Sequence, residues 1–500
     1  MASGIEPVVL CDALAHIDHA WLRGRRWFSS KGRTIASITV ADWGSLPLDE
    51  PAILALLRVG YTRGRDEILL LPVAALAAES CDPAHAALLQ ISHAGIQWVL
   101  IDAFLLPDFQ RLLIDRLIEG VPLALTGGRI DFAPAARLQA LTLPRREIRL
   151  VTAEQSNTSI IYDRQAILKC FRRVVAGINP DVEVAHFLTS HTSFTSTPAL
   201  LGSMAYTDAA GVVHSLGMLQ EFVANQGDMW QHVQAHLTQL LATATTAPDA
   251  TLLRRHAAVA LAELTTLGER TGALHQALAS DVADPAFAPQ PLTASQAATW
   301  EATIRDECRV TLADLAQRSS SLPSAVANDV AVLLADPVRV EAGLAGLTAL
   351  GQAGVTMTRF HGDYHLGQVL VSERGLLILD FEGEPLRTLA ERRAHGSPLK
   401  DVAGMLRSLS YAATAAAFAS GAAMAHAWAA IWEAAAREAF LAGYCAATAG
   451  ASFMPPPPVF RAAVAAFEIE KAIYELNYEL NNRPDWLAIP LRGILQSLAE

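Results

Sequence analysis

One segment, residues 359–385 (RFHGDYHLGQVLVSERGLLILDFEGEP), constrains this chain more than any other. Asp363 lies in a His-Gly-Asp loop, the amide side chain of Gln368 comes five residues later, and Asp380 ends an apolar strand twelve residues beyond that. Taken singly, an Asp after Gly is usually a turn former, and an Asp at a strand end is often only a cap. Together and in this order, the three side chains favour a functional site built on a loop, a short strand and a second loop.

The spacing matches the catalytic pattern of protein-kinase-like folds, in which an Asp, an amide side chain and a strand-end Asp-Phe pair form one site. Phosphoryl transfer needs a carboxylate that orients and deprotonates the attacking hydroxyl, and hard oxygen ligands that hold Mg²⁺ on the nucleotide phosphates. Asp363 fits the first task, and Gln368 and Asp380 fit the second. Glu382 and Glu384 could bind a second cation, which makes Glu382 a further metal candidate, or they could equally fix the loop by accepting backbone hydrogen bonds. The pattern therefore predicts ATP and Mg²⁺ as cofactors.

A kinase-like fold also needs a part that holds the nucleotide, and the short strands between residues 145 and 174 offer one. Lys169 lies on the apolar strand AILKCF, where a lysine would reach the α- and β-phosphates, and Glu183 follows in a predicted helix, where it could pair with that lysine. The preceding turn lacks a GxGxxG pattern, so its phosphate contacts would come from hydroxyl and backbone N–H groups. The candidates for these contacts are Ser156, Asn157, Thr158 and Ser159. The strand LQEFV would follow as the hinge, with backbone atoms of Glu221 and Val223 facing adenine.

The arrangement of apolar residues changes along the chain. Short apolar runs alternate with turns over residues 35–72 and 145–174, which is typical of sheets, whereas residues 230–351 form long Ala/Leu patterns typical of helices. We therefore predict an α+β, bilobal, protein-kinase-like fold with ATP and Mg²⁺ in the cleft between the lobes. Its expected parts are an N-terminal β-rich cap subdomain (1–130), a mostly β nucleotide-binding part (131–225) and a large helical C-terminal lobe with the catalytic loop and the acceptor site (226–500).

Local signals set boundaries in the helical part. Thr293 with Gln296 three residues later has the form of a capping box, which predicts that a helix begins there. Four prolines at 455–458 cannot continue a helix, so a final helix should run from roughly 459 to 480. Asp401 follows a Ser-Pro pair at another predicted helix start, which makes it a structural anchor under the catalytic loop rather than a ligand.

Composition narrows the choice of partners and compartment. The chain has 38 Lys+Arg against 50 Asp+Glu and a formal net charge of −12, which argues against electrostatic capture of nucleic acid. Five scattered cysteines without a CxxC pair argue against a disulfide framework or a structural zinc site. The N-terminus lacks the form of a signal peptide, and the apolar stretch 411–431 is mostly Ala, which favours a buried helix over a membrane span. We expect a cytoplasmic protein with no nucleic-acid and no membrane partner.

Sequence blocks along nearly the whole chain resemble one family. They are RRWFSSKGR (25–33), QSNTS (155–159), FRRVVAGINPDVEV (171–184), LQEFVANQGDMW (219–230), HGDYHLGQ (361–368), DFEGEP (380–385), SPLKDVAGMLRS (397–408) and YELNYELNNRPDW (474–486). Together they resemble the bacterial maltokinases, relatives of the aminoglycoside and choline kinases. The resemblance implies ATP-dependent phosphorylation of the anomeric hydroxyl of maltose to maltose 1-phosphate, within α-glucan (glycogen) and trehalose metabolism. It also implies His361 as an acceptor contact and association with a trehalose-isomerising enzyme.

The last predicted helix offers a face for the acceptor sugar. Its members share i, i+3 and i+4 spacing and are Phe467, Lys471, Tyr474 and Tyr478. A lysine and two tyrosines can donate hydrogen bonds to sugar hydroxyls and pack against a sugar ring, but the same spacing also fits a packed core face with a snorkelling lysine. The resemblance of YELNYELNNRP to the maltokinases favours the acceptor site, to which Arg483 is added.

Two other hypotheses stay open. The same fold could phosphorylate glucosamine or another small sugar, and extra acidic groups in the pocket would favour an amino sugar. The chain could also be a catalytically inactive module that binds a nucleotide or docks a partner. The presence of Lys169, Asp363, Gln368 and Asp380 argues against this second alternative, because the loss of one such residue is the usual sign of an inactive kinase.

Overall fold

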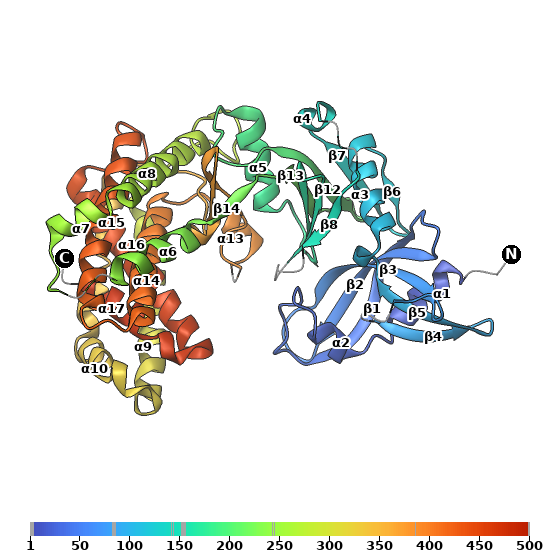
Figure 1. The fold of residues 1–500 in the computed structure, drawn as a ribbon, viewed down its shortest axis with the longest axis horizontal. Helices are drawn as coiled ribbons and strands as arrows, with labels where there is room; N and C mark the ends of the chain where they lie inside the picture. The colour runs from blue at the N-terminus through green and yellow to red at the C-terminus, as the bar shows by residue number, and fades with distance from the viewer. Residues whose placement is uncertain are drawn as a thin grey trace. The chain divides into compact units, whose positions relative to one another are not determined.

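The computed structural model describes residues 5–82, 87–141, 143, 145–151, 157–242, 244, 246–385 and 387–498. The chain forms two compact units (Figure 1). The first comprises residues 1–186 and 198–224 and is mostly β, and the second comprises residues 187–197 and 225–500 and is mostly helical. This division agrees with the predicted change from strand patterns to helix patterns near residue 225.

The first unit begins with an antiparallel sheet in the order β1-β2-β3-β5-β4, with β11 paired to β3. Its strands are β1 (Ile35–Ser45), β2 (Ala52–Tyr61), β3 (Glu67–Ala77), β4 (Leu89–His93), β5 (Ile96–Asp102) and β11 (Arg173–Val174), preceded by α1 (Pro7–Leu14) and α2 (His19–Arg23). Successive side chains of a strand point to opposite faces. Ile53 and Leu57 accordingly share a core with Leu10 of α1, whereas Leu54 and Leu56 belong to a second core. Burial on both faces explains why this strand is continuously apolar.

A second antiparallel sheet, in the order β6-β7-β12-β13-β10-β9-β8, packs on that second core. Its strands are β6 (Leu123–Ala124), β7 (Arg129–Pro134), β8 (Ile148–Val151), β9 (Asn157–Tyr162), β10 (Ala166–Phe171), β12 (Leu200–Thr207) and β13 (Val213–Glu221). The helices of this region are η1 (Ala103–Leu105), α3 (Pro107–Glu119), α4 (Ala136–Gln139) and α5 (Pro180–His191). The domain boundary that we expected at residue 130 falls inside β7. Strand β7 pairs with β6 and with β12, and the expected boundary stays a prediction.

A buried arginine ties the two sheets together. Arg172 is 2% exposed, and its Nη2 donates to Asp102 Oδ2 at the end of β5 (2.6 Å). Its Nε donates to Thr158 Oγ1 on β9 (2.7 Å), and its guanidinium lies 4.1 Å from the centroid of the Phe104 ring. A guanidinium offers several donors in a fixed plane, so one side chain can hold elements from both sheets at once.

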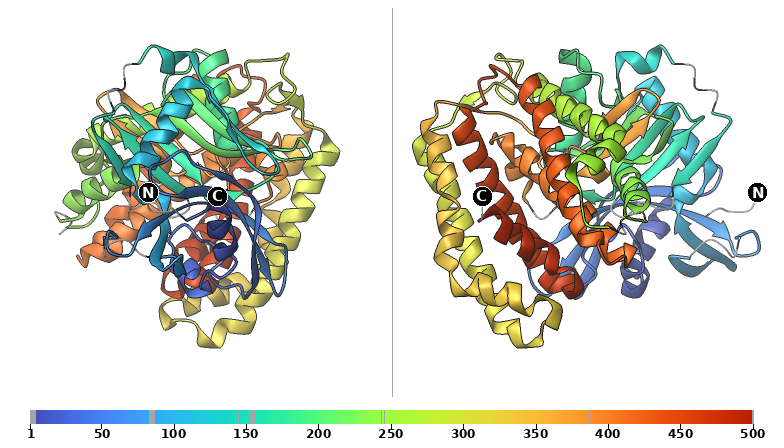
Figure 2. Two further views of the ribbon diagram at one scale, coloured as in Figure 1. Left: turned by 90° about the vertical axis from the view of Figure 1, so that its right-hand side faces the viewer. Right: turned by 60° about the vertical axis from the view of Figure 1, so that its left-hand side comes forward.

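The second unit consists mainly of helices. They are α6 (Met229–Ala242), α7 (Ala250–His256), α8 (Ala258–Leu278), α9 (Ala294–Arg318), η2 (Ser319–Ser321), η3 (Ser324–Val326), α10 (Ala327–Ala335), α11 (Pro337–Ala342), α12 (Ala345–Gln352), η4 (Leu366–Gln368), α13 (Leu389–Arg393), α14 (Leu399–Ser420), α15 (Ala425–Ala447), α16 (Pro457–Asn482), η5 (Pro484–Trp486) and α17 (Ala488–Ser497). The short strands β14 (Asn225–Asp228), β17 (Val369–Ser372) and β18 (Gly375–Ile378) form one sheet, and β15 (Gln290–Pro291) pairs with β16 (Thr356–Met357). Helices α9 and α16, yellow and red in Figure 2, pack against each other.

Small residues explain the close packing of the Ala-rich helices. A side chain on Gly268 of α8 would collide with the carbonyl oxygen of Phe440 on α15, and one on Gly443 of α15 would collide with the carbonyl oxygen of Thr265. The stretch 411–431 is divided between α14 and α15 rather than forming one helix. No helix among the described residues is both long enough and apolar enough to cross a membrane.

The predicted helix boundaries are largely confirmed. The amide of Gln296 donates to Thr293 Oγ1 (3.2 Å) and the amide of Thr293 donates to Gln296 Oε1 (3.0 Å), which completes the capping box at the start of α9. Helix α16 begins at Pro457, two residues earlier than expected. Its first turn accommodates prolines because the N–H groups there have no partner within the helix.

Replacing Thr293 with Ala should lower the free energy of unfolding by about 1 kcal/mol, because the amide of Gln296 loses its acceptor. Urea denaturation followed by circular dichroism measures this. Thr299→Ala on the same helix is a matched control, since the Thr299 hydroxyl donates only to the backbone oxygen of Ser295. Equal losses in the two variants would show that the capping box does not contribute.

Candidate active site

A buried carboxylate holds the loop that carries Asp363. The backbone amides of His361 and Gly362 donate to Asp401 Oδ2 and Oδ1 at 2.7 and 2.9 Å, and His275 Nε2 lies 3.0 Å from Oδ2. Asp401 comes from the first turn of α14, where acidic residues are favoured. Gly362 has φ +86°, a conformation that favours glycine. The prediction that Asp401 is a structural anchor is confirmed.

His361 also acts within the loop. Its ring is 1% exposed and lies between Tyr364 and Phe381, with ring centroids 5.2 and 5.0 Å away. Nε2 lies 2.8 Å from the backbone oxygen of Leu379, the residue before Asp380. The buried ring of His361 thus connects the catalytic loop to the end of the neighbouring strand, and its contact with the acceptor stays a prediction.

The catalytic candidate faces a lysine from the last long helix. Lys471 Nζ lies 3.3 Å from Asp363 Oδ1 and donates to Glu384 Oε1 at 2.7 Å. Burial alone would lower the pKa of Lys471, but the negative charges of Glu384 and Asp363 outweigh it and hold the pKa above its ordinary value. The lysine ammonium is therefore charged at neutral pH.

Asp363, Lys471 and Tyr474 line one pocket of about 280 Å³, formed entirely within the second unit. Other lining residues are Trp300, Glu307, Tyr364, Glu384, Arg387, Lys400, Phe467 and Glu470. The described walls of this pocket do not include Tyr478 or Arg483. Tyr478 is 45% exposed, and Arg483 lies over its ring while binding Glu479. Of the predicted acceptor face, the pocket includes Phe467, Lys471 and Tyr474, and sugar contacts of Tyr478 and Arg483 stay predictions.

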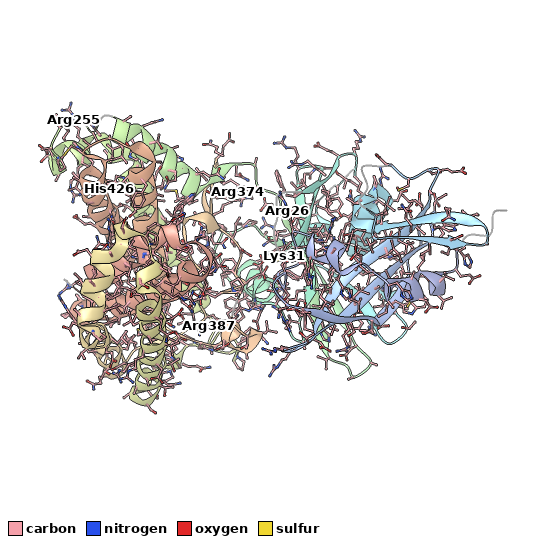
Figure 3. All side chains as sticks on the ribbon, turned by 90° about the horizontal axis from the view of Figure 1, so that it is seen from below. Arg26, Lys31, Arg255, Arg374, Arg387 and His426 are labelled. Carbon is pink, nitrogen blue, oxygen red and sulfur yellow. The ribbon has the colours of Figure 1, made fainter. Side chains whose placement is uncertain are left out.

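Acidic and basic side chains alternate around the pocket. Arg387, labelled in Figure 3, lies 3.3 Å from Glu384 and 3.7 Å from Glu307, and Lys400 donates to Glu470 at 2.7 Å. Burial raises the pKa of Glu307, Arg387 opposes this, and the charge of Glu470 adds to it. The Glu384 carboxylate accepts hydrogen bonds from the side chains of Arg387 and Lys471. The sequence analysis did not identify Glu307, Arg387 and Lys400 as pocket residues. For Arg387, its position three residues after Glu384 could have indicated an ion pair.

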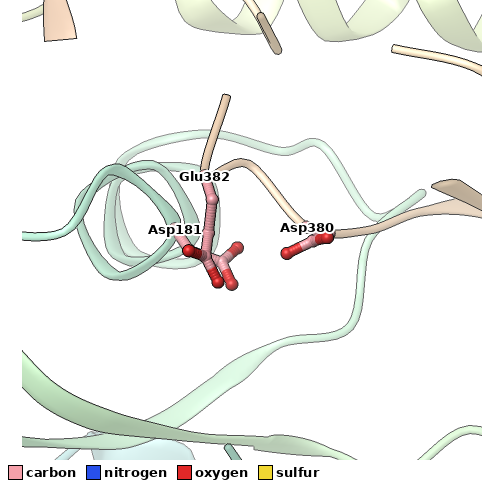
Figure 4. A group of neighbouring side chains, drawn as sticks. All are labelled: Asp181, Asp380 and Glu382. Carbon is pink, nitrogen blue, oxygen red and sulfur yellow. The ribbon is translucent and has the colours of Figure 1, made fainter. Parts of the chain in front are cut away.

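The predicted metal ligands lie close together at the C-terminal end of β18. Gln368 Nε2 donates to Asp380 Oδ2 at 3.1 Å, and Asp380 and Glu382 carry oxygens within 4.8 Å of each other (Figure 4). Asp380 has φ +65°, which Asp tolerates better than most residues. Two carboxylates and an amide oxygen are the hard donors that Mg²⁺ takes, so the donor set fits the ion. Their role as ligands stays a prediction. Asp181, also labelled in Figure 4, belongs to the first unit.

In the first unit, Lys169 lies on β10 opposite Ser159 of β9 and Met218 of β13. Its ammonium lies 2.9 Å from Asp181 Oδ2 in the first turn of α5. Lys169 thus forms an ion pair with a carboxylate of the predicted helix. That carboxylate belongs to Asp181, two residues before the predicted partner Glu183. The pairing with Glu183 stays a prediction.

Three of the four residues predicted to cover the phosphates lie on a strand. Asn157, Thr158 and Ser159 are part of β9 and are buried, because the strand begins at Asn157. The Thr158 hydroxyl accepts a hydrogen bond from Arg172 Nε, and its predicted phosphate contact stays a prediction. Ser156 lies outside the described residues. The phosphate roles of Asn157 and Ser159 stay predictions.

The strand predicted as the hinge is β13, which ends at Glu221. Its amide donates to the backbone oxygen of Ala199 (2.9 Å), so that N–H group serves the sheet and not adenine. The chain passes from the first unit to the second between Ala224 and Asn225, directly after Val223. The predicted hinge therefore lies at the connection between the units, and contacts of Glu221 and Val223 with adenine stay predictions.

Comparisons with known proteins fit this architecture. A solved glucosamine kinase (crystal form B) superposes with a TM-score of 0.67 and 21% identity, covering 98% of this chain and 99% of that one. The chain has the fold of the glucosamine kinases. A glucosamine kinase in complex with glucosamine, ADP and inorganic phosphate gives a TM-score of 0.65 at 20% identity, covering 97% of this chain and 98% of that one. The predicted α+β kinase-like fold with a large helical C-terminal region is confirmed.

Sequence comparisons add a domain and two relatives. Residues 21–105 match the model of the maltokinase N-terminal cap domain, which confirms the predicted cap. The glucosamine kinase of Streptacidiphilus jiangxiensis is 27% identical over 263 residues, which cover 52% of this chain and about half (53%) of that protein. The glucosamine kinase of Mycolicibacterium smegmatis is 25% identical over 345 residues, covering 68% of this chain and 77% of that protein.

Proposed function

We propose that this chain is an ATP-dependent sugar kinase that phosphorylates the anomeric hydroxyl of maltose. One observation carries the proposal: the Asp363 carboxylate lies on a pocket walled by aromatic rings and hydrogen-bonding side chains. Pockets of this kind bind small polar molecules, because the rings pack against apolar faces while charged groups fix the orientation. The match of residues 21–105 to the maltokinase cap domain supports maltose as the acceptor.

The geometry suits transfer to a hydroxyl group. An acceptor hydroxyl beside Asp363 would be oriented by the carboxylate, which receives its proton as the bond from the sugar oxygen to the γ-phosphorus of ATP forms. The bond between that phosphorus and the β,γ-bridging oxygen breaks, which leaves ADP and the sugar phosphate. Lys169 would neutralise charge on the α- and β-phosphates. Asp380, Gln368 and Glu382 would hold Mg²⁺, which when bound neutralises negative charge on the phosphate oxygens.

A second candidate acceptor is glucosamine, since the relatives and solved structures described above are glucosamine kinases. The acidic side chains of the pocket could bind an amino group. The proposal also includes the cytoplasmic location, the role in α-glucan and trehalose metabolism, and the trehalose-isomerising partner that the maltokinase resemblance implies.

A coupled assay of ADP release with Mg²⁺ tests the proposal on maltose, glucose, glucosamine, trehalose and no sugar. We expect turnover that depends on maltose and a product with an acid-labile anomeric phosphate. Turnover on glucosamine alone would retain the kinase and replace the acceptor. ATP binding without turnover on any sugar would instead favour an inactive nucleotide-binding module.

A further inference from the structure

The ammonium of Lys471 contacts two of the carboxylates that line the pocket. It lies between Asp363 Oδ1 (3.3 Å) and Glu384 Oε1 (2.7 Å), and 5.0 Å from the centroid of the Tyr474 ring. Two carboxylates and the face of an aromatic ring form the surroundings that an ammonium group prefers. Lys471 thus occupies the position in which the amino group of a ligand would contact both carboxylates and the tyrosine ring.

The other acidic groups of the pocket are also compensated. Arg387 lies near Glu384 and Glu307, and Lys400 donates to Glu470. The Glu391 carboxylate accepts hydrogen bonds from the backbone and the hydroxyl of Thr388, as the capping group of α13. A second cation would therefore compete with three basic side chains for carboxylates that they already contact.

We infer that Lys471 sets the acceptor specificity of the pocket, admitting neutral sugars and rejecting amino sugars. The inference rests on the proposed function and names its substrate class. An amino sugar whose protonated nitrogen approached Asp363 or Glu384 would be repelled by Lys471 or would have to displace it. A neutral sugar meets no such repulsion. The ammonium has three donors, and its contacts with Asp363 and Glu384 leave one for a sugar hydroxyl.

The test compares glucose with glucosamine, which differ only in the group at carbon 2, and adds N-acetylglucosamine as the uncharged derivative. In Lys471→Met, the ratio of kcat/KM for glucosamine to that for glucose should rise about tenfold or more, a change of about 1.4 kcal/mol in relative transition-state binding. The ratio for N-acetylglucosamine to glucose should stay unchanged. Lys471→Arg keeps the positive charge and should keep the wild-type preference.

Two further variants guard against indirect effects. Lys471→Gln supplies a second neutral side chain in case the Met variant folds poorly. Lys400→Met removes the charge of another lysine that lines the same pocket but contacts Glu470 instead of Asp363, so it should not raise the glucosamine ratio. An increase of equal size in Lys400→Met would show that overall charge decides the preference, and would overturn the inference.

Calorimetric titration with glucosamine and glucose separates this inference from the kinase proposal, because it needs no turnover. Glucosamine should bind Lys471→Met at least about tenfold more tightly than it binds the wild type, with little change for glucose. If no sugar is phosphorylated but this shift is seen, the kinase proposal fails and the inference stands. The inference is wrong if the wild type prefers glucosamine to glucose. It is also wrong if Lys471→Met and Lys471→Gln leave the glucosamine-to-glucose ratio unchanged both in kcat/KM and in affinity.

Discussion

Asp363→Asn is expected to lower kcat for every accepted sugar by about a hundredfold or more, the range in which a positioned general base contributes. The amide cannot accept the hydroxyl proton, yet it has almost the same shape as the carboxylate. The loop should keep its conformation, because the amides of His361 and Gly362 are held by Asp401 and not by Asp363. Steady-state ADP release at saturating sugar and ATP measures the loss.

The matched control is Asp306→Asn on α9. Its side chain is 77% exposed and forms only a surface ion pair with Arg309 (3.5 Å), so kcat should not change. Asp363→Asn also removes the negative charge beside Lys471, which could alter sugar binding. The loss should nevertheless persist at saturating sugar, because it concerns the bound complex. A variant that retained near-normal kcat would remove Asp363 from the catalytic role.

The features of the fold that could be predicted from the sequence are those that depend on residues close to one another in the chain. Strands with period-2 patterns, the capping box at Thr293 and the proline break before α16 all depend on neighbours within a few residues, and the structure has them where expected within a few positions. The segment from Asp363 to Asp380 contains only the end of the catalytic loop, η4 and the hairpin of β17 and β18. Its side chains are therefore brought together by short-range folding, as the hydrogen bond between Gln368 and Asp380 shows.

The walls of the pocket come from segments that are distant in the sequence. Local sequence patterns do not predict which of these segments pack together. Trp300 and Glu307 come from α9, about sixty residues before the catalytic loop, and Lys400 follows it on α14. Helical spacing predicts which residues share a face of α16, but not that the described walls of the pocket end at Tyr474, one turn before Tyr478. The burial of His361 could not be predicted for a related reason: a polar residue in a catalytic motif can be buried for structure as well as exposed for binding.

Asp401→Ala should lower the free energy of unfolding by about 3–5 kcal/mol, the range for removing one partner of a buried charged group. Asp401 is 1% exposed, and its loss leaves the amides of His361 and Gly362 and the ring of His275 without their acceptor. Urea denaturation at neutral pH measures this. Asp306→Ala, at an exposed site, should change the free energy of unfolding by less than about 0.5 kcal/mol.

The loss should also depend on pH, in a direction set by the pKa of Asp401. Burial alone would raise that pKa, but the hydrogen bond and charge of His275 and the amide of Gly362 outweigh it and hold the pKa below its ordinary 3.8. A carboxyl group with a lowered pKa in the folded state stabilises the fold above the unfolded pKa, and this contribution disappears as the pH falls through the folded pKa. The wild type and Asp401→Ala should therefore differ most near neutral pH and converge below about pH 3.8. A difference that stayed constant as the pH fell well below 3.8 would show that Asp401 acts through packing alone and not through its charge.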